Sequence, residues 1–158
     1  MNIDILTILP KMFAPVLDES IIKRARKKGL VKIDVHDIRD YSCDKHRKID
    51  DRPFGGGPGM VFKPEPIFEA VRRLQKGRTK AKVILLSPQG AKLTQQLAKK
   101  LSAQKHLILI CARYEGIDER VKTYLVHEEV SIGYYIVSGG ELPAMVVTRL
   151  AGVSSRMA

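Results

Sequence analysis

The most informative stretch of this sequence is the apolar run Leu107-Ile108-Leu109-Ile110, which ends at Cys111 and is followed by Ala112-Arg113-Tyr114-Glu115-Gly116. A short continuous apolar run bounded by a turn signal is typical of a strand that is buried on both faces. Such strands occur mainly in parallel sheets that helices cover on both sides. We therefore expect 107–110 to be an inner strand, Cys111 to be a small core residue and 111–116 to be a loop at its carboxyl end.

Strands and helices are predicted to alternate along the rest of the chain. Apolar runs predict strands at 3–9 and 83–86, and the alternation of apolar and polar residues predicts a half-buried strand at 31–35. Helical spacing of apolar residues predicts helices at 16–28, from 64 to before 77, and around 93–101. The polar, glycine-rich segment 40–59 has no periodicity and is expected to be a long loop. This alternation predicts one α/β domain with a mostly parallel sheet flanked by helices.

The chain is strongly basic, with 28 Lys and Arg residues against 17 Asp and Glu residues and a net charge of +11 over 158 residues. An excess of this size favours a polyanionic partner, because cationic side chains release counterions from a phosphate backbone. A merely solvated basic surface is the alternative, and charge alone leaves both open. The sequence contains no Trp, which argues against a stacking platform for single-stranded nucleic acid.

The composition also restricts the compartment. The longest apolar runs are far shorter than the roughly 20 residues that span a bilayer. The N-terminal residues lack the basic region of a secretory signal. Two cysteines, Cys43 and Cys111, do not form a disulfide framework. We expect a cytoplasmic protein with no membrane contact.

Three segments are expected at the carboxyl edge of the sheet, where ligands of such folds bind. They are 86–90, 111–116 and 131–141, and each contains glycine. Glycine lets backbone groups approach a ligand closely, and an adenine ring is bound well between apolar walls. Leu86, Ile132, Tyr135 and Val137 are candidates for those walls. Three ordinary strand-to-helix turns are the alternative.

Other motifs give weaker signals. Segment 54–60 is glycine-rich, but no Gly-Lys-Ser/Thr follows, so it is not a phosphate-binding P-loop and is better interpreted as a substrate-contact loop or a plain surface loop. Cys43 and His46 have metal-like spacing without a second pair, so we predict no metal site. The charged cluster 115–120 is either a catalytic edge or a helix start with acidic residues in its first turn.

Four motifs together resemble one family. They are Phe54-Gly55-Gly56-Gly57-Pro58-Gly59-Met60, Leu86-Ser87-Pro88-Gln89-Gly90, Arg113-Tyr114-Glu115-Gly116-Ile117-Asp118-Glu119-Arg120 and Ser138-Gly139-Gly140-Glu141-Leu142-Pro143-Ala144-Met145. In this order they are similar to the TrmD-type bacterial tRNA (guanine-N1)-methyltransferases, over about nine-tenths of the chain. The resemblance implies a SPOUT-type fold with a trefoil knot, although knots are otherwise rare. It also implies a homodimer whose active sites lie at the subunit interface.

The implied reaction moves a methyl group from S-adenosylmethionine to N1 of the guanosine just 3′ of the tRNA anticodon, position 37. Guanine N1 carries a proton, so a carboxylate base and a cation facing O6 would serve the transfer. The resemblance makes Arg149 and Glu115 the candidate catalytic residues, with a role in fixing the loops as the alternative for Glu115. The sulfonium leaves without help from a metal, and the resemblance leaves a Mg²⁺ requirement open. The implied cofactor-binding residues are Leu86, Ser87, Pro88, Ala112, Ile132, Gly133, Tyr134, Tyr135, Ile136, Val137, Gly139, Gly140 and Pro143.

The chain departs from the family pattern in three places. Ala112 stands where the family usually has glycine, and Tyr134 where it usually has aspartate. The third departure is the tail after Met145, where Arg149 matches an essential arginine only if about four residues, close to one helical turn, are missing. We expect residues 1–158 to be the S-adenosylmethionine-binding domain without the linker aspartate and the tRNA-binding domain. The chain alone is therefore expected to methylate tRNA poorly, and a catalytically idle S-adenosylmethionine- and tRNA-binding fragment is the alternative function.

Overall fold

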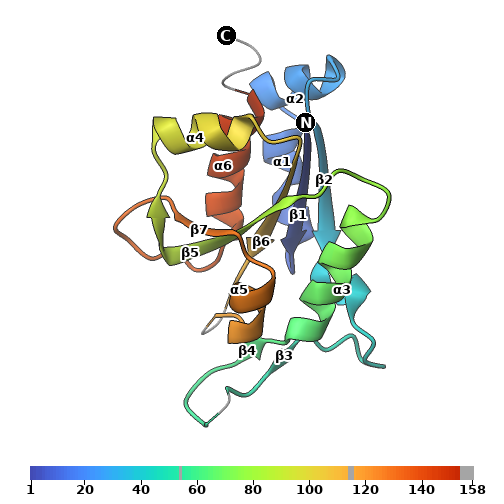
Figure 1. Cartoon of the computed structure of the whole chain (residues 1–158), viewed down its shortest axis with the longest axis vertical. Helices are drawn as coiled ribbons and strands as arrows, with labels where there is room; N and C mark the ends of the chain where they lie inside the picture. Colours follow the sequence, from blue (N-terminus) through green and yellow to red (C-terminus); the bar gives the residue numbers. More distant parts are fainter. Residues whose placement is uncertain (54, 114–115, 154–158) are drawn as a thin grey trace.

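The computed structural model describes residues 1–53, 55–113 and 116–153. Within them a five-stranded sheet has the order β2-β1-β6-β5-β7, and every neighbouring pair of strands is parallel (Figure 1). A separate two-stranded antiparallel sheet joins β3 (Asp50–Asp51) and β4 (Val61–Phe62). The predicted mostly parallel sheet is confirmed. The strands of the main sheet are β1 (Asn2–Thr7), β2 (Lys32–Asp37), β5 (Lys82–Lys92), β6 (His106–Cys111) and β7 (Glu128–Ser131).

Helices cover both faces of this sheet. The side chains of a strand alternate between its two faces, so neighbouring residues of one strand pack into different cores. In β6, Leu107 and Leu109 belong to a core that includes residues of α2, α4 and α6. Ile108 and Ile110 belong to a second core, which includes residues of α3 and α5. The doubly covered inner strand expected from the apolar run is confirmed. The helices are α1 (Ala14–Leu17), α2 (Ser20–Lys27), α3 (Pro64–Gln75), α4 (Gln95–Ser102), α5 (Glu119–Tyr124) and α6 (Glu141–Val153).

The predicted helix at 16–28 is wrong in one respect, since the structure divides this region into α1 and α2. Glu19 is extended, with φ −129° and ψ 160°, and Ser20 has φ +55°, so the chain cannot continue one helix through them. Arg26 spans the break by donating to the Asp18 carboxylate at 2.7 Å and to the Leu17 carbonyl at 3.3 Å. The sequence did not predict this break, because the helical spacing of apolar residues continues across it.

The predicted strand at 83–86 is longer in the structure, where β5 continues to Lys92. Its pairing with β7 changes register on the way, because Leu86 and Ala91 both lie opposite Val130. Residues 87–90 therefore bulge out of the ladder instead of forming the expected loop after it. This bulge lies at the edge where a ligand was expected.

Strand β1, which neighbours the central strand β6, carries a buried charged cluster on the face that α3 covers. Asp4 is 1% exposed, and its two carboxylate oxygens lie 2.7 Å from Nε2 of His36 and 2.7 Å from Nε2 of His106. Arg78 donates to the same carboxylate at 3.4 Å. Burial alone raises the pKa of Asp4, but the hydrogen bonds from His36 and His106 outweigh it and hold the pKa below its ordinary value of 3.8. The cluster ties β1, β2 and β6 together.

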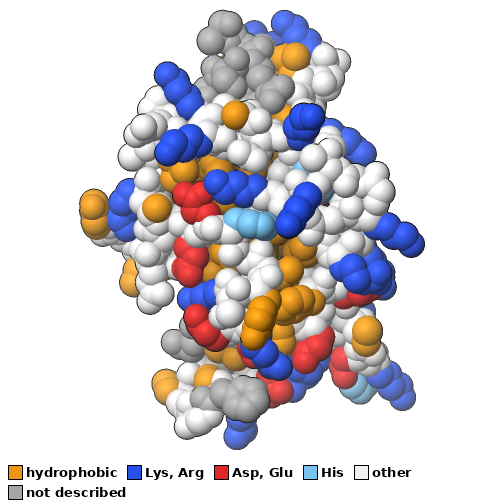
Figure 2. All heavy atoms as spheres, in the orientation of Figure 1, with side chains coloured by type: hydrophobic (Ala, Val, Ile, Leu, Met, Phe, Trp, Pro, Cys, Tyr) orange, Lys and Arg blue, Asp and Glu red, His pale blue; other side chains and the backbone are white. Residues whose placement is uncertain are grey.

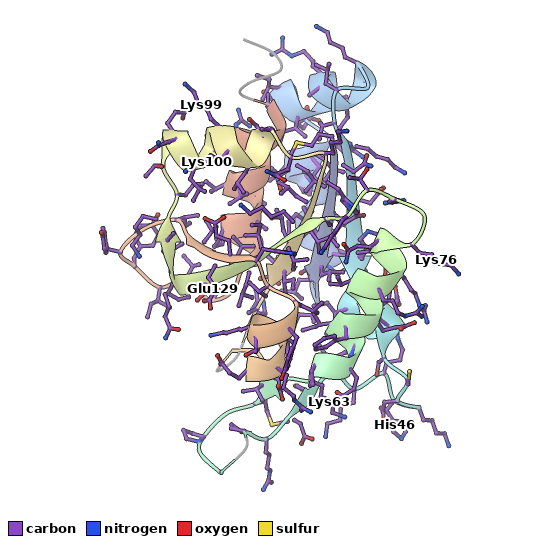
Figure 3. All side chains as sticks on the ribbon, viewed as in Figure 1. His46, Lys63, Lys76, Lys99, Lys100 and Glu129 are labelled. Carbon is purple, nitrogen blue, oxygen red and sulfur yellow. The ribbon has the colours of Figure 1, made fainter. Side chains whose placement is uncertain are left out.

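The surface is rich in basic side chains. Figure 2 shows Lys and Arg side chains spread over the visible face instead of gathered in one patch. Lys99 and Lys100 extend from α4 and Lys76 from the end of α3, and all three are exposed (Figure 3). Among the described residues, none of the helices combines the length and apolarity that a membrane crossing requires.

Candidate functional site

A cavity of about 490 Å³ lies at the carboxyl ends of β5, β6 and β7. Its volume is in the range of small-molecule and cofactor sites. The three segments expected at this edge all contribute to its walls. Its described lining residues are Leu85, Leu86, Ser87, Pro88, Gln89, Ala112, Arg113, Gly116, Ile117, Lys122, Val130, Ser131, Ile132, Tyr135, Ile136, Val137, Ser138, Gly139, Gly140 and Pro143.

The first wall is the bulge of β5. A Cβ added at Gly90 would lie 2.5 Å from the carbonyl carbon of Glu129 and 2.5 Å from the amide nitrogen of Val130. Only glycine therefore allows the end of the bulge to approach the backbone of β7 so closely. Ser87 stabilises the bulge locally, because its hydroxyl accepts from the Gln89 amide at 3.2 Å.

The second wall forms where the segment after β6 meets the start of α6. A Cβ at Gly140 would lie 2.7 Å from Cα of Cys111, and the Gly140 amide donates to the Ala112 carbonyl at 2.9 Å. Cys111 is fully buried, as expected, and burial raises the pKa of its thiol well above the ordinary value. The two segments are thus joined backbone to backbone.

A buried ion pair fixes the same wall. Glu141 is 1% exposed, and its Oε2 accepts from Nε of Arg113 at 3.0 Å. Its other oxygen accepts from the hydroxyl of Thr7 at 2.9 Å. A Cβ at Gly139 would lie 2.5 Å from Oε2 of Glu141 and 2.8 Å from Nε of Arg113, so this glycine makes room for the ion pair.

The third wall is the segment from Ser131 to Val137. The Ser131 hydroxyl donates to the Gly133 carbonyl at 2.9 Å, and the Tyr135 hydroxyl donates to the Ile132 carbonyl at 3.3 Å. Lys92 joins this wall to the bulge, because its ammonium group donates to Ser131 Oγ at 3.2 Å and to the Pro88 carbonyl at 3.4 Å. Hydrogen bonds therefore link two walls of the cavity across its rim.

Most residues predicted to bind a cofactor lie around this one cavity. The exceptions are Gly133 and Tyr134, which do not line it. Tyr134 is 92% exposed, and its ring centroid lies 4.5 Å from Nζ of Lys92 in a cation–π contact. The predicted residues that line the cavity are Leu86, Ser87, Pro88, Ala112, Ile132, Tyr135, Ile136, Val137, Gly139, Gly140 and Pro143.

The two candidate catalytic residues are placed differently. Glu115 lies outside the described residues. Arg149 is exposed on α6 and is not among the residues that line the cavity. The structure therefore does not bring Arg149 into the cavity of its own chain. Its catalytic role stays a prediction.

Sequence reasoning missed two cationic residues of the cavity, Arg113 and Lys122. Arg113 belongs to one of the four family motifs and follows the end of a strand, so its position could have predicted a place at the ligand edge of the sheet. Lys122 had no such signal, because it lies on α5 and reaches the cavity only through the fold. It is paired with Glu129 of β7 at 3.7 Å and with Glu119 at 4.0 Å.

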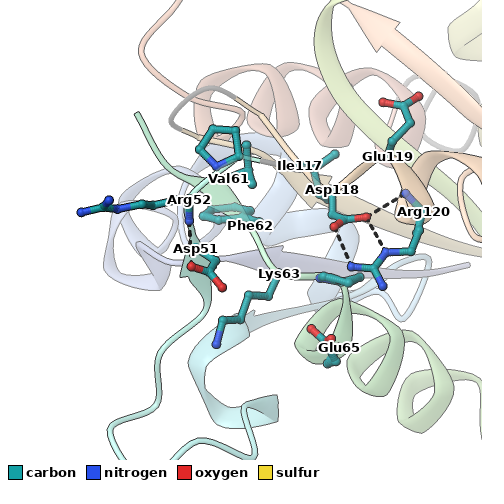
Figure 4. A pocket seen from close by; sticks show the side chains of 12 residues that line it. Asp51, Arg52, Val61, Phe62, Lys63, Glu65, Ile117, Asp118, Glu119 and Arg120 are labelled. Carbon is teal, nitrogen blue, oxygen red and sulfur yellow. Dashed lines mark hydrogen bonds and ion pairs between the residues drawn. The ribbon is translucent and has the colours of Figure 1, made fainter. Parts of the chain in front are cut away.

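A second cavity, of about 590 Å³, lies between the β3–β4 sheet and the start of α5 (Figure 4). Asp118 is the N-cap of α5, since its carboxylate accepts from the Arg120 amide at 2.9 Å. The Arg120 guanidinium also donates to both oxygens of Asp118 at 2.9 Å, and this holds the pKa of Asp118 below its ordinary value. The described part of the charged cluster 115–120 is thus a helix start with an acidic N-cap. Arg52, at the rim of this second cavity, points away from it (Figure 4).

The fold and the first cavity define an α/β domain with a ligand site at the carboxyl edge of a parallel sheet. Comparison with known proteins identifies the family. The model of the tRNA (guanine-1)-methyltransferase TrmD family matches residues 1–155, and this chain belongs to that family.

Individual relatives agree with the assignment. The tRNA (guanine-N(1)-)-methyltransferase of Dictyoglomus turgidum is 56% identical over 147 residues, which cover 93% of this chain and 59% of the relative. The enzyme of the same name from Geobacillus kaustophilus is 53% identical over 147 residues, covering 93% of this chain and 60% of the relative. The chain thus spans about three-fifths of the length of these curated relatives.

A solved structure has the same fold. It is the crystal structure of tRNA (m1G37) methyltransferase from Aquifex aeolicus, with a TM-score of 0.91 and 38% sequence identity. The alignment covers 100% of this chain and 72% of the Aquifex chain. The resemblance inferred from the motifs is confirmed at the level of family and fold.

Proposed function

We propose that this chain is the cofactor-binding domain, residues 1–158, of an S-adenosylmethionine-dependent tRNA (guanine-N1)-methyltransferase that acts on guanosine 37. The observation that carries the proposal is the glycine-built cavity at the carboxyl ends of β5, β6 and β7 in a chain of this family. The alternative of an idle fragment has no observation in its favour. A tRNA substrate also fits a cytoplasmic location.

The residues of the cavity fit an adenosine-containing cofactor. Leu86, Ile136 and Val137 offer apolar surface, and Gly139 and Gly140 also line the cavity. Apolar walls with a few polar groups are the usual setting for such ligands. The segments 86–90, 111–116 and 131–141 would hold it together, and we propose that they do so within a trefoil knot.

The cofactor would supply an electrophilic methyl group on a sulfonium, so the methyl transfer itself needs no metal, and the family resemblance leaves a Mg²⁺ requirement open. The protein then has to remove the N1 proton of guanine and stabilise the charge that develops on O6. General-base catalysis typically contributes about 10²–10⁴-fold to such a step. We propose Arg149 as the cation for O6, and Glu115, which lies outside the described residues, stays the predicted catalytic carboxylate.

Arg149 can reach a cavity if two chains associate through α6. The exposed residues Leu142, Val146 and Arg149 are spaced four and three apart and form one stripe along this helix. Ile136, 83% exposed, adds apolar surface at the cavity rim. An apolar stripe of this kind suits a two-fold symmetric interface, in which the arginine of one chain meets the cavity of the other.

Sedimentation at micromolar concentration tests the dimer. The unchanged chain is expected to sediment at twice 17.7 kDa, and Val146→Glu is expected to shift it towards the monomer. Tyr124→Glu, at an exposed aromatic residue of α5, is the matched control and should leave the dimer intact. A monomer for the unchanged chain would overturn the dimer proposal.

The net charge of +11 suits a tRNA partner. Binding through phosphate contacts weakens with salt, with a slope of about −0.7 to −0.9 per contact in a plot of log affinity against log salt concentration. A flat dependence would count against a phosphate-binding surface and in favour of a merely solvated one.

Two measurements test the enzyme assignment. Isothermal titration with S-adenosylhomocysteine should give saturable binding, and ligand at 100 times its dissociation constant should stabilise the fold by about 2.7 kcal/mol. A radiolabelled methyl-transfer assay then uses unmodified tRNA and a tRNA with adenosine at position 37. It is run with this chain and with a chimera that carries the remaining length of the Dictyoglomus relative. Methyl transfer should require guanosine 37. The proposal would be overturned if neither protein transferred a methyl group, or if the chain did not bind S-adenosylhomocysteine.

A further inference from the structure

A cationic side chain, that of Arg113, lines the cofactor cavity, and the sequence did not predict it as a binding residue. The side chain of Arg113 is 22% exposed and lines the cavity directly after β6. One edge of its guanidinium is fixed, because Nε donates to Glu141 at 3.0 Å. Glu141 is held in turn by the Thr7 hydroxyl, so both of its carboxylate oxygens have a donor.

This arrangement leaves the outer edge of the guanidinium available. An arginine side chain carries several N–H groups in a planar fork and can bind acceptors on two edges at once. Within the described part of the chain, the Arg113 side chain makes one hydrogen bond, the one from Nε. The Nη groups therefore remain for a ligand, while the space left by Gly139 keeps the ion pair in place.

The charge of the cavity indicates what that ligand group is. Among its described lining residues, Arg113 and Lys122 are the charged ones, and both are cations. Lys122 already has two carboxylate partners, at 3.7 Å and 4.0 Å. Both oxygens of Glu141 already have a donor, so the Nη edge of Arg113 is suited to an anionic group of the ligand.

We propose that Arg113 binds the carboxylate of the amino-acid part of the cofactor and that Glu141 is the positioning residue that holds Arg113 for it. This rests on the proposed function, since it presumes that the cavity binds S-adenosylmethionine and its product. The carboxylate is the anionic group of that cofactor, whereas the adenosine part is neutral. A bidentate pair of arginine and carboxylate fixes geometry as well as affinity.

A pair of ligands isolates the amino-acid part of the cofactor. S-adenosylhomocysteine contains its carboxylate and its α-amino group, and 5′-methylthioadenosine contains the adenosine and sulfur but lacks both. The α-amino group is cationic, so a preference that is lost when an arginine is replaced reports the carboxylate. Titration calorimetry of both ligands is run on the unchanged chain and on Arg113→Gln, Arg113→Lys, Glu141→Gln and, as the matched control at the other cavity cation, Lys122→Gln. Binding of methylthioadenosine also reports whether a variant still has a folded cavity.

Hydrogen bonds to charged groups contribute about 1.5–3 kcal/mol, which corresponds to roughly 10- to 100-fold in affinity. Arg113→Gln should weaken S-adenosylhomocysteine by that factor and leave methylthioadenosine within about twofold. Arg113→Lys should restore part of the affinity, because it keeps the charge and loses the fork. Glu141→Gln should lower the preference for S-adenosylhomocysteine by a smaller factor, and Lys122→Gln should leave it unchanged.

The outcomes separate this inference from the function on which it rests. If the unchanged chain binds neither ligand, the proposed function fails. If it binds both and Arg113→Gln weakens them equally or not at all, the carboxylate assignment is wrong. If Lys122→Gln removes the preference instead, Lys122 is the residue that binds the carboxylate and the inference is overturned. An Arg113→Gln variant that no longer folds leaves Arg113→Lys to decide between these results.

Discussion

Replacing Asp4 by alanine tests whether the buried charged cluster holds the sheet together. The carboxylate is 1% exposed and receives hydrogen bonds of 2.7 Å from each of His36 and His106. The side chain of His106 is itself 1% exposed, and its other ring nitrogen lies 3.0 Å from the Thr79 carbonyl. Both nitrogens of this imidazole therefore face acceptors, and the substitution leaves a buried donor without its partner.

The expected loss follows from that geometry. Removing one partner of a buried ion pair costs about 3–5 kcal/mol, because the remaining group stays buried without compensation. The total stability of a domain is about 5–15 kcal/mol, so the loss is a large fraction of it. At roughly 2–4 °C per kcal/mol for a chain of this size, the melting temperature should fall by about 6–20 °C.

The pH dependence gives a second signature. The pKa of Asp4 in the folded protein lies below its ordinary value of 3.8, so the folded state binds this proton less readily than the unfolded state. The contribution of Asp4 to stability is then fully present above the unfolded pKa and is lost as the pH falls through the folded pKa. The difference in stability between the unchanged chain and the variant should therefore be constant near neutral pH and shrink in the acid range below about 3.8.

Urea unfolding followed by circular dichroism measures both effects. Asp34→Ala is the matched control, because Asp34 lies directly opposite Asp4 on the neighbouring strand β2, its side chain is 41% exposed and it pairs with Lys32 at 3.5 Å. An exposed pair of this kind contributes about 0–1 kcal/mol. If Asp4→Ala lost no more stability than Asp34→Ala, or if its deficit were the same at acid and neutral pH, the structural role assigned to the cluster would be wrong.

Three further predictions concern the cofactor cavity and the cysteines. Gly140→Ala should lower the melting temperature and the cofactor affinity together. Gly152→Ala is the control, because a Cβ at Gly152 would meet other atoms no closer than 3.4 Å. In thermal unfolding this control should be neutral or should stabilise α6 by up to about 1 kcal/mol. Lys92→Met should lower the free energy of unfolding by about 0.5–1 kcal/mol in urea unfolding, as the loss of an exposed cation–π contact implies, and an unchanged stability would show that the link across the rim is dispensable. In the folded chain a disulfide reagent should titrate Cys43 and not the buried Cys111, whose raised pKa suppresses the thiolate, and rapid reaction of both thiols would contradict the burial.

The sheet was predictable from the sequence because its inner strands are continuous apolar runs, and the alternation of Leu107 and Ile108 between the two cores follows from strand geometry alone. Two features were not predictable. The break before α2 depends on the conformation of Glu19 and Ser20, neither of which interrupts the apolar pattern. The extension of β5 depends on its pairing with Val130, a contact that only the folded sheet creates.

The candidate site was predictable to the extent that its residues stand directly after strands. The edge rule predicted the three segments that line the cavity, and the full set of expected cofactor residues came from the family resemblance. It could not place Lys122, which enters from α5, nor the pairing of Arg113 with Glu141, which are separated by 28 positions in the chain. Arg149 lies outside the cavity because α6 turns that side chain outwards, and the sequence pattern of a single helix does not say which neighbour an exposed stripe meets.

The glycines of the motifs have a different physical role from the one that their positions suggested. They were expected to let the backbone approach a ligand, but the closest atoms to an added Cβ at Gly90 and Gly140 belong to the backbone of β7 and β6. At Gly139 the closest atoms belong to Glu141 and Arg113. Each glycine therefore allows two walls of the cavity to meet within the protein. It follows that a substitution at any of the three would deform the cavity before a ligand arrives, so its effect on binding should be accompanied by a loss of stability. The same is not expected of Arg113→Lys, which keeps the walls in contact and changes only the group offered to the ligand.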